Sequence, residues 1–261
     1  MDYSEILRGQ EYAFIGTNLH LGRYVILLGV AESSGSGARQ EDGSPAVRGV
    51  ALSRKSDLIG LTRFEQYEDQ GTDTVIYSFN KAVRLLLGAN PDALELLGLR
   101  PENYLYLGGI GQELIQNAGL FLSKRVTSVY EGYAQIQLRQ LQNLLFQVDL
   151  PGPGGRTGDC SRLNRCAERL VRVLMTGVDI LETGRVIAGR EKEQDLLNGI
   201  LRGDYQKRDG SFREEFYEIV SEYKRRMEYA DAHTFLPEEP DLKRVQDYVM
   251  SVNERVVRDE I

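Results

Sequence analysis

The sequence predicts an α+β fold, in which a small β-sheet is followed by a helical half. Three observations predict it. Apolar and β-branched runs that suit strands lie within the first 80 of the 261 residues. Patterns with helical spacing fill most of the chain after Ser78. Residues 149–159 hold two Pro and four Gly and form a candidate linker inside the helical half.

The elements of the predicted sheet are short. Residues 3–13 have the pattern of an amphipathic helix, and the Gly- and Ser-rich segment 32–46 is expected to be a loop. Residues 53–71 carry charges and turn signals. Within this segment, the short run "DLIGL" is expected to be extended. The three predicted strands are residues 24–30, 47–52 and 74–77.

The helical half begins with two amphipathic segments that are split at "GANP", where Asn90 is a good N-cap and Pro91 suits the first helical position. A later helix carries an apolar stripe from Leu163 to Leu181. The linker suggests one domain at 1–150 and a helical domain at 159–261. The further predicted helices are 110–118, 124–147, 161–184, 191–202, 212–233 and 240–256.

Composition excludes several classes of protein. The formal net charge of −7 argues against a general nucleic-acid binder, although a local basic face is compatible with it. Cys160 and Cys166 are too few for a disulfide framework or a zinc site, so we expect a reducing, cytoplasmic compartment. We expect no membrane association, because no apolar run approaches the ~18 residues of a transmembrane helix and the N-terminus lacks a signal peptide's apolar segment.

The segment "AESSGSGARQEDGSPAVRGV" after the first strand is the main candidate for chemistry. Small residues allow backbone N–H groups to approach a triphosphate. Metal-dependent phosphoryl transfer would also need two carboxylates one residue apart on a strand, where both point to one face, and a third on a neighbouring strand.

These residues resemble the predicted nucleotidyltransferases of the DNA polymerase β superfamily, in the branch found in bacteria and phages, sometimes beside RNA ligases. That branch has Gly-Ser-x-x-x-Gly, a polar loop, then Ser-Asp-x-Asp-x-Arg-Gly-Val. Ser33, Gly37 and the run "RGV" at 48–50 match it. The resemblance continues to the far end of the chain, through "SRKSDLIGL", "FEQY", "TDTVIYSFNKAVRLLL", "NPDALELLGL", "FLSKR", "GYAQIQLRQLQ", "TGVDILETG" and "VMSVNERVV".

The departures from this family fall on the chemistry. Ser44 and Ala46 stand at the two metal-binding Asp positions, and Glu32 replaces the leading Gly. Ala has no ligand atom, and a Ser hydroxyl is a poor substitute for a carboxylate on Mg²⁺. After the linker, Arg165-Cys166 and Arg169 replace a Lys-His pair and a further His that the family tends to carry.

The resemblance retains Asp73 as the third acid and a metal ligand. Asp42 is a candidate replacement because it lies two positions before Ser44, although Gly43 and Pro45 disfavour a regular strand there. Arg48 would bind a phosphate or pair with Glu32. The candidate nucleotide-binding residues are Ser33, Gly35, Ser36, Gly37, Ser44, Arg48, Arg165, Arg169 and Arg172.

Arg162, Arg165, Arg169 and Arg172 have the i, i+3, i+7, i+10 spacing of one helix face. That face would hold a triphosphate or an RNA backbone, or it is an ordinary solvated surface in which Glu168 is interspersed. His20 and His233 are isolated in sequence, and structural roles are favoured for both.

Three hypotheses about function stay open. In the first, a pseudoenzyme keeps a nucleotide or RNA site but has impaired or lost two-metal catalysis. In the second, an active nucleotidyltransferase moves a nucleoside monophosphate from an NTP to RNA, a protein or a small molecule, using Mg²⁺ held by Asp42, Asp73 and Glu32. In the third, the chain is a structural or interaction protein that needs no cofactor or ligand. The sequence favours the first and identifies no protein partner.

Overall fold

The computed structural model describes residues 9–31, 46–148, 157–187, 193–207 and 209–260. Contacts divide the chain into two compact units. We call Met1–Ser123 with Glu239–Ile261 the sheet unit, and Lys124–Glu238 the helical unit. This division differs from the boundaries expected at 150 and 159, because the two helices on either side of residues 149–156 pack against each other inside the helical unit.

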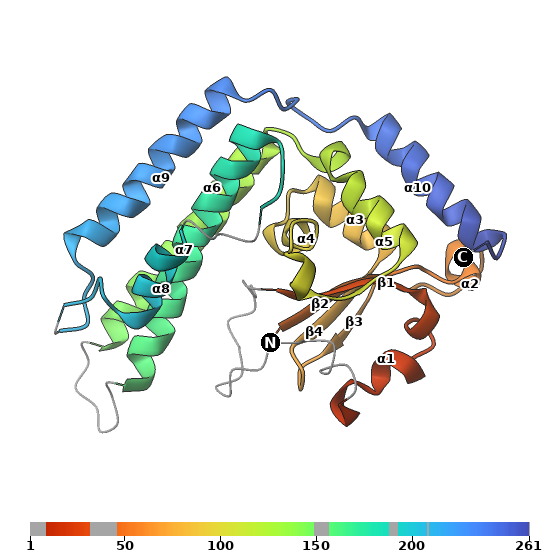
Figure 1. The fold of residues 1–261 in the computed structure, drawn as a ribbon, viewed down its shortest axis with the longest axis horizontal. Coiled ribbons are helices and arrows are strands. Elements are labelled where there is room, and N and C mark those ends of the chain that lie inside the picture. Colours follow the sequence, from red (N-terminus) through yellow and green to blue (C-terminus); the bar gives the residue numbers. More distant parts are fainter. Residues whose placement is uncertain (1–8, 32–45, 149–156, 188–192, 208, 261) are drawn as a thin grey trace. The chain divides into compact units, whose positions relative to one another are not determined.

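The sheet unit contains a five-stranded mixed sheet in the order β3-β4-β2-β1-β5 (Figure 1). β2 and β4 are parallel, and the other neighbours are antiparallel. The predicted α+β fold, with a small mixed sheet followed by helices, is confirmed. The strands are β1 (Val25–Ala31), β2 (Ala46–Ala51), β3 (Gln66–Asp69), β4 (Thr74–Ser78) and β5 (Tyr104–Leu107).

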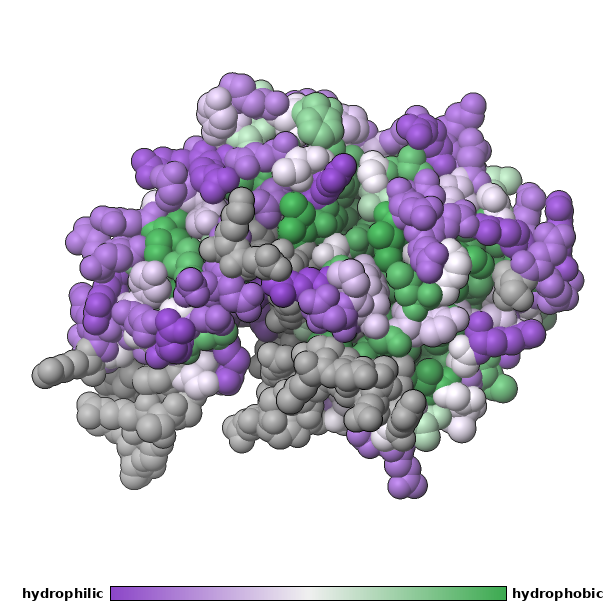
Figure 2. Space-filling model, viewed as in Figure 1, coloured by the Kyte–Doolittle hydropathy of each residue, from purple (hydrophilic) through white to green (hydrophobic). Residues whose placement is uncertain are grey.

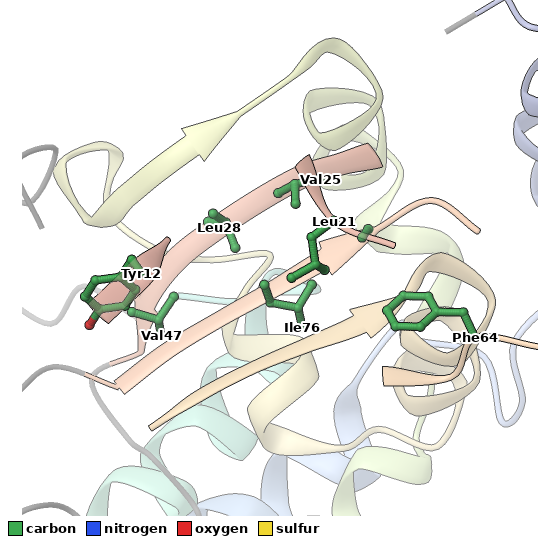
Figure 3. Close-up of a cluster of buried hydrophobic side chains, with 8 residues drawn as sticks. Tyr12, Leu21, Val25, Leu28, Val47, Phe64 and Ile76 are labelled. Atoms are coloured by element: carbon green, nitrogen blue, oxygen red, sulfur yellow. The ribbon is translucent and has the colours of Figure 1, made fainter. Parts of the chain in front are cut away.

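The helices of the sheet unit lie on both faces of the sheet. In Figure 1, α3, α4 and α5 lie on one face and the N-terminal segment with α1 lies on the other. The N-terminal segment packs Tyr12 and Leu21 against strand residues such as Val47 and Ile76 (Figure 3). The helices are α1 (Phe14–Thr17), α2 (Lys55–Ile59), α3 (Phe79–Leu87), α4 (Pro91–Glu95), α5 (Gly109–Gln116) and α10 (Leu242–Val257), with 3₁₀ turns at Gln10–Tyr12, Gly22–Tyr24, Pro101–Asn103 and Ala118–Phe121.

Local sequence explains where the α3–α4 break falls. The side chain of Asn90 accepts a hydrogen bond from the backbone N–H of Ala93 (3.0 Å), and Pro91 occupies the first turn of α4, as predicted. Gly49 in β2 is required by packing, because a Cβ atom there would lie 2.7 Å from the backbone oxygen of Leu27. Gly at this position therefore allows β1 and β2 to approach each other.

The "DLIGL" segment is not extended, and this prediction was wrong. Residues Lys55–Ile59 form α2, and at its start the carboxylate of Asp57 accepts a hydrogen bond from the backbone N–H of Arg54 at 3.2 Å. Burial acts to raise the pKa of Asp57, but hydrogen bonds from Arg54 and Thr62 outweigh it and lower that pKa to about 2. His20 also lies 3.2 Å from this carboxylate and stacks on Phe64, which gives it a structural contact.

The last helix, α10, belongs to the sheet unit and not to the helical unit. Arg255 donates two hydrogen bonds to the carboxylate of Glu113 on α5, at 3.0 and 2.8 Å. The ring of Tyr248 packs edge-on against Phe79 on α3. Contacts of this kind between residues far apart in sequence were not predictable from the helical pattern of residues 240–256.

The helical unit consists of α6 (Arg125–Val148), α7 (Thr157–Thr183), α8 (Gln194–Arg202) and α9 (Glu214–His233). α7 packs against the other three. The predicted apolar stripe of α7 is buried from Leu163 to Leu181. None of the helices in the described ranges has the length and hydropathy that crossing a bilayer requires.

Candidate functional site

The candidate site lies where the parallel strands β2 and β4 begin. Their register pairs Val47 with Thr74, and the N–H of Val47 donates to the backbone oxygen of Asp73 at 3.1 Å. Ala46, the position before Val47, is therefore next to Asp73. The structure thus brings together two of the three positions where the resemblance places metal-binding acids.

Arg48 occupies the same face of β2 as Ala46, because side chains alternate along a strand. Its Nη2 atom donates to Oδ1 of Asp73 at 3.0 Å, and its Nη1 atom donates to the backbone oxygens of Val47 and Asp73. The side chains of Arg48 and Asp73 are only 4% and 12% exposed. Asp73 is thus an observed partner of Arg48, whereas Glu32, the predicted alternative to a phosphate, lies outside the described residues.

The turn between β3 and β4 holds Asp73 in place. The carboxylate of Asp69 accepts hydrogen bonds from the N–H and the hydroxyl of Thr72, both at 2.8 Å. Asp73 itself has a φ of 46°, in the left-handed region that Asp and Asn adopt more readily than most side chains. The residue thus provides both a carboxylate and the backbone conformation of this turn.

Tyr12 is a site residue that the sequence did not indicate. Burial raises the pKa of its phenol, and the negative charges of Glu11, Asp69 and Asp73 act in the same direction. Its ring lies against the sheet close to Val47 (Figure 3). The phenol group therefore lies in the electrostatic field of the candidate site. A single Tyr in a short N-terminal segment carries no pattern that would have predicted this.

The described residues of this site do not fit a pair of Mg²⁺ ions. Ala46 is fully buried and has no ligand atom, and the guanidinium of Arg48 next to Asp73 opposes a cation at that carboxylate. In the part of the chain that the structure describes, no three His, Cys, Asp or Glu side chains are grouped so that they could hold a metal. We therefore derive no catalytic step through a metal.

The remaining loop candidates cannot be placed. Glu32, Ser33, Gly35, Ser36, Gly37, Asp42 and Ser44 all lie outside the described residues. The predicted roles of Asp42 as a catalytic acid and of the loop in binding phosphates stay predictions.

The predicted arginines after the linker lie on α7, in the helical unit. Arg165 is exposed, and its Nη1 atom donates to the hydroxyl of Ser161 at 2.7 Å. Arg172 donates to the carboxylate of Glu168. Cys166 is buried and its thiol contacts Gln137, so it is a packing residue in this structure.

Comparison with known proteins decides the family. A family model described as "RNA repair pathway DNA polymerase beta family", RlaP, matches residues 23–251. The chain belongs to the RlaP family. No curated protein and no solved structure matched significantly. The match covers β1 to α10 and so includes both units of the RlaP chain.

Membership in RlaP confirms the predicted resemblance to nucleotidyltransferases of the DNA polymerase β superfamily. Nucleotidyltransferases of this family typically use Mg²⁺ and a nucleoside triphosphate. The assignment of metal-binding acid positions to residue 46 and Asp73 rests on the resemblance given above and stays a prediction.

Proposed function

We propose that this chain is a nucleotidyltransferase-fold protein that binds a nucleotide or RNA and has impaired or lost two-metal catalysis. The observation that carries this proposal is the buried Ala46 beside Asp73. Two-metal phosphoryl transfer depends on carboxylates that place the ions on both sides of the reacting phosphorus. Of the three predicted acid positions, two hold Ser44 and Ala46, and the acid at the third, Asp73, is bound by Arg48. Little metal affinity is therefore expected.

The nucleotide would be held by groups that need no metal. Backbone N–H groups of a glycine-rich loop and guanidinium groups both bind phosphate oxygens. Ser33, Gly35, Ser36, Gly37 and Ser44 supply the proposed loop, and Arg48 supplies a cation at its end. The arginines of α7, which belong to the helical unit, are proposed as a separate set of phosphate ligands. RNA is the favoured partner class because RlaP is a family of an RNA repair pathway.

The second candidate is an active nucleotidyltransferase, and the retention of Asp73 at the start of β4 favours it. In that case Asp42 and Glu32 would complete the metal site. Such an enzyme would transfer a nucleoside monophosphate to RNA, a protein or a small molecule.

A two-part experiment separates these functions. Thermal unfolding is measured with each NTP and with mixed RNA, in the presence of Mg²⁺ or Mn²⁺, and a ligand at 100 times its Kd stabilises by about 2.7 kcal/mol. The protein is also incubated with labelled NTPs and mixed RNA, with Asp73→Asn as the control. Asn is chosen because it adopts a positive φ more readily than Ala does.

The proposal predicts a thermal shift with at least one NTP and no label transfer above the Asp73→Asn control. Label transfer that depends on Asp73 would establish the active enzyme instead. If neither nucleotides nor RNA change the thermal transition, the chain is a structural or interaction protein.

A further inference from the structure

The solvent-facing side of the first half of α7 is basic. Arg162 and Arg165 are exposed, Arg169 is half-buried, and the side chain of Arg172 is 16% exposed. Between these positions the helix buries Leu163, Ala167, Leu170 and Val171 against its neighbours. We call Arg162, Arg165 and Arg169 the α7 arginine row. In Figure 2 the face of the helical unit in view is mostly hydrophilic, with few apolar patches.

The charges of this row have no ion-pair partner among the described residues of the helical unit. Arg172 pairs with Glu168, so its charge is compensated. Within the described ranges, none of the three row arginines makes an ion pair, and Arg165 donates only to the neutral hydroxyl of Ser161. Neighbours in the row are three and four residues apart, and like charges at that spacing destabilise a helix. The row therefore opposes helix stability.

Two independent observations place Arg162 and Arg169 on the same patch. They are seven residues apart, which is nearly two helical turns. Both also act on the thiol of Cys166: burial raises the pKa of this thiol, and the charges of Arg169 and Arg162 act to lower it. Two guanidinium groups therefore lie close enough to one buried atom to act on it together.

The charge of the whole chain is unevenly divided. Residues 124–238 contain 18 Arg and Lys and 18 Asp and Glu, so the formal charge of −7 belongs entirely to the sheet unit. The net charge of the sheet unit therefore repels a polyanion at long range, whereas the helical unit is formally neutral and presents the α7 arginine row, which has no ion-pair partner among the described residues. Electrostatic attraction of this kind decides where a nucleic acid docks.

We propose that the α7 arginine row binds the phosphate backbone of single-stranded RNA. This inference rests on the proposed function and names a part of the surface that RNA would use. Arg162 and Arg169, the ends of the row, are seven residues apart, which is about 10 Å along the helix axis. At one charge per ~3.4 Å of a strand, that length corresponds to about three phosphates. A guanidinium binds phosphate oxygens in a bidentate manner, and contacts to phosphates carry no sequence information. Binding is thus independent of sequence.

The test is fluorescence anisotropy of a labelled 12-nucleotide RNA of mixed sequence, titrated with the full-length protein at several KCl concentrations. For single strands, the slope of log K against log salt is about −0.7 per phosphate contact. Replacing three arginines should reduce that slope by about 2 and weaken binding at 0.1 M KCl by roughly 100-fold. The test variant is Arg162→Gln with Arg165→Gln and Arg169→Gln, because Gln keeps helix propensity.

A matched control removes the same charge elsewhere in the helical unit. Arg202, Arg225 and Arg226 each form an ion pair, with Asp204, Glu222 and Glu182 respectively. The control variant replaces these three with Gln, and its RNA affinity should fall by less than a factor of 10. Circular dichroism checks that both variants are folded, and thermal shift with NTPs is measured on each.

Each outcome separates this inference from the proposed function. Equal loss of RNA binding in both variants would mean that general charge governs binding, and the row has no special part. If the row variant still binds RNA, the row is not the RNA site. If NTPs shift the thermal transition but the wild type binds no RNA, the RNA role of the row is wrong and the proposed nucleotide binding stands. If the wild type binds neither NTPs nor RNA, both proposals are wrong. If sedimentation shows that the row instead holds a second copy of the chain, the RNA role is wrong.

Discussion

Replacing Arg48 with Met should destabilise the sheet unit more than most single substitutions do. Met fills a similar volume without charge or donors. The substitution leaves the carboxylate of Asp73 without its cation, at 12% exposure, and removes donors from the backbone oxygens of Val47 and Asp73. Because a protein interior solvates these oxygen atoms less well than water does, removing their hydrogen-bond donors lowers the free energy of unfolding.

The magnitude follows from burial. Removing one partner of a buried ion pair costs about 3–5 kcal/mol. The exposed pair Arg63–Glu65, whose side chains are 76% and 37% exposed, provides a matched control, and Arg63→Met should cost less than about 1 kcal/mol. The double variant Arg48→Met with Asp73→Asn should cost about 1–3 kcal/mol less than the sum of the single variants, because its second change removes the stranded charge.

The assay is urea unfolding followed by circular dichroism and Tyr fluorescence, since the chain has no Trp. Hydrogen exchange in peptides from β2 and β4 assigns the transition of the sheet unit. At an m-value of about 3 kcal/mol/M, the midpoint for Arg48→Met should fall by about 1–1.7 M. If Arg48→Met costs no more than Arg63→Met, or if the double variant is additive, the buried pair does not stabilise this end of the sheet.

Three further predictions concern stability. The pKa of Asp57 is lowered to about 2 in the folded chain, from an ordinary value of 3.8, so its contribution of about 2 kcal/mol should be present above pH 4 and be lost between about pH 4 and 2. Urea midpoints measured across that range should lose this step in Asp57→Asn; an unchanged step would assign it to other acids. Gly49→Ala should destabilise by about 1–3 kcal/mol because its Cβ would meet the oxygen of Leu27, whereas Gly132→Ala on α6, where nothing lies within 4 Å, should be neutral or stabilise by up to about 1 kcal/mol. Equal effects in thermal unfolding would show that β1 moves to accommodate the methyl group. Asn90→Ala should cost about 1 kcal/mol through loss of the α4 cap, and a midpoint within error of the wild type would show that this cap is dispensable.

Sequence patterns predicted the elements that have strong periodicity. The apolar strand β1 and the long amphipathic helices α6, α7 and α9 have the burial that their patterns indicate. The weak elements were missed for physical reasons. β3 and β5 have four residues each, too few for an alternating pattern, and α2 depends on side-chain hydrogen bonds made by Asp57.

The candidate site was predictable only in part. The resemblance pointed to positions 44 and 46 and to Asp73 on a neighbouring strand, but the predicted second strand began only at Val47. The pairing of Arg48 with Asp73 depends on the parallel register of β2 and β4, which no local pattern encodes. The contribution of Tyr12 depends likewise on how the N-terminal segment packs across the sheet.

The central claim is that the start of β2 lacks the acids that would hold metal beside Asp73. The most direct measurement is the anomalous scattering of Mn²⁺ in crystals of the wild type and of the variant Ser44→Asp with Ala46→Asp. We expect no Mn²⁺ peak near Asp73 in the wild type and a peak in the variant, coordinated by the introduced carboxylates. A well-occupied Mn²⁺ in the wild type, bound by Asp73 together with other acids of the chain, would contradict the account.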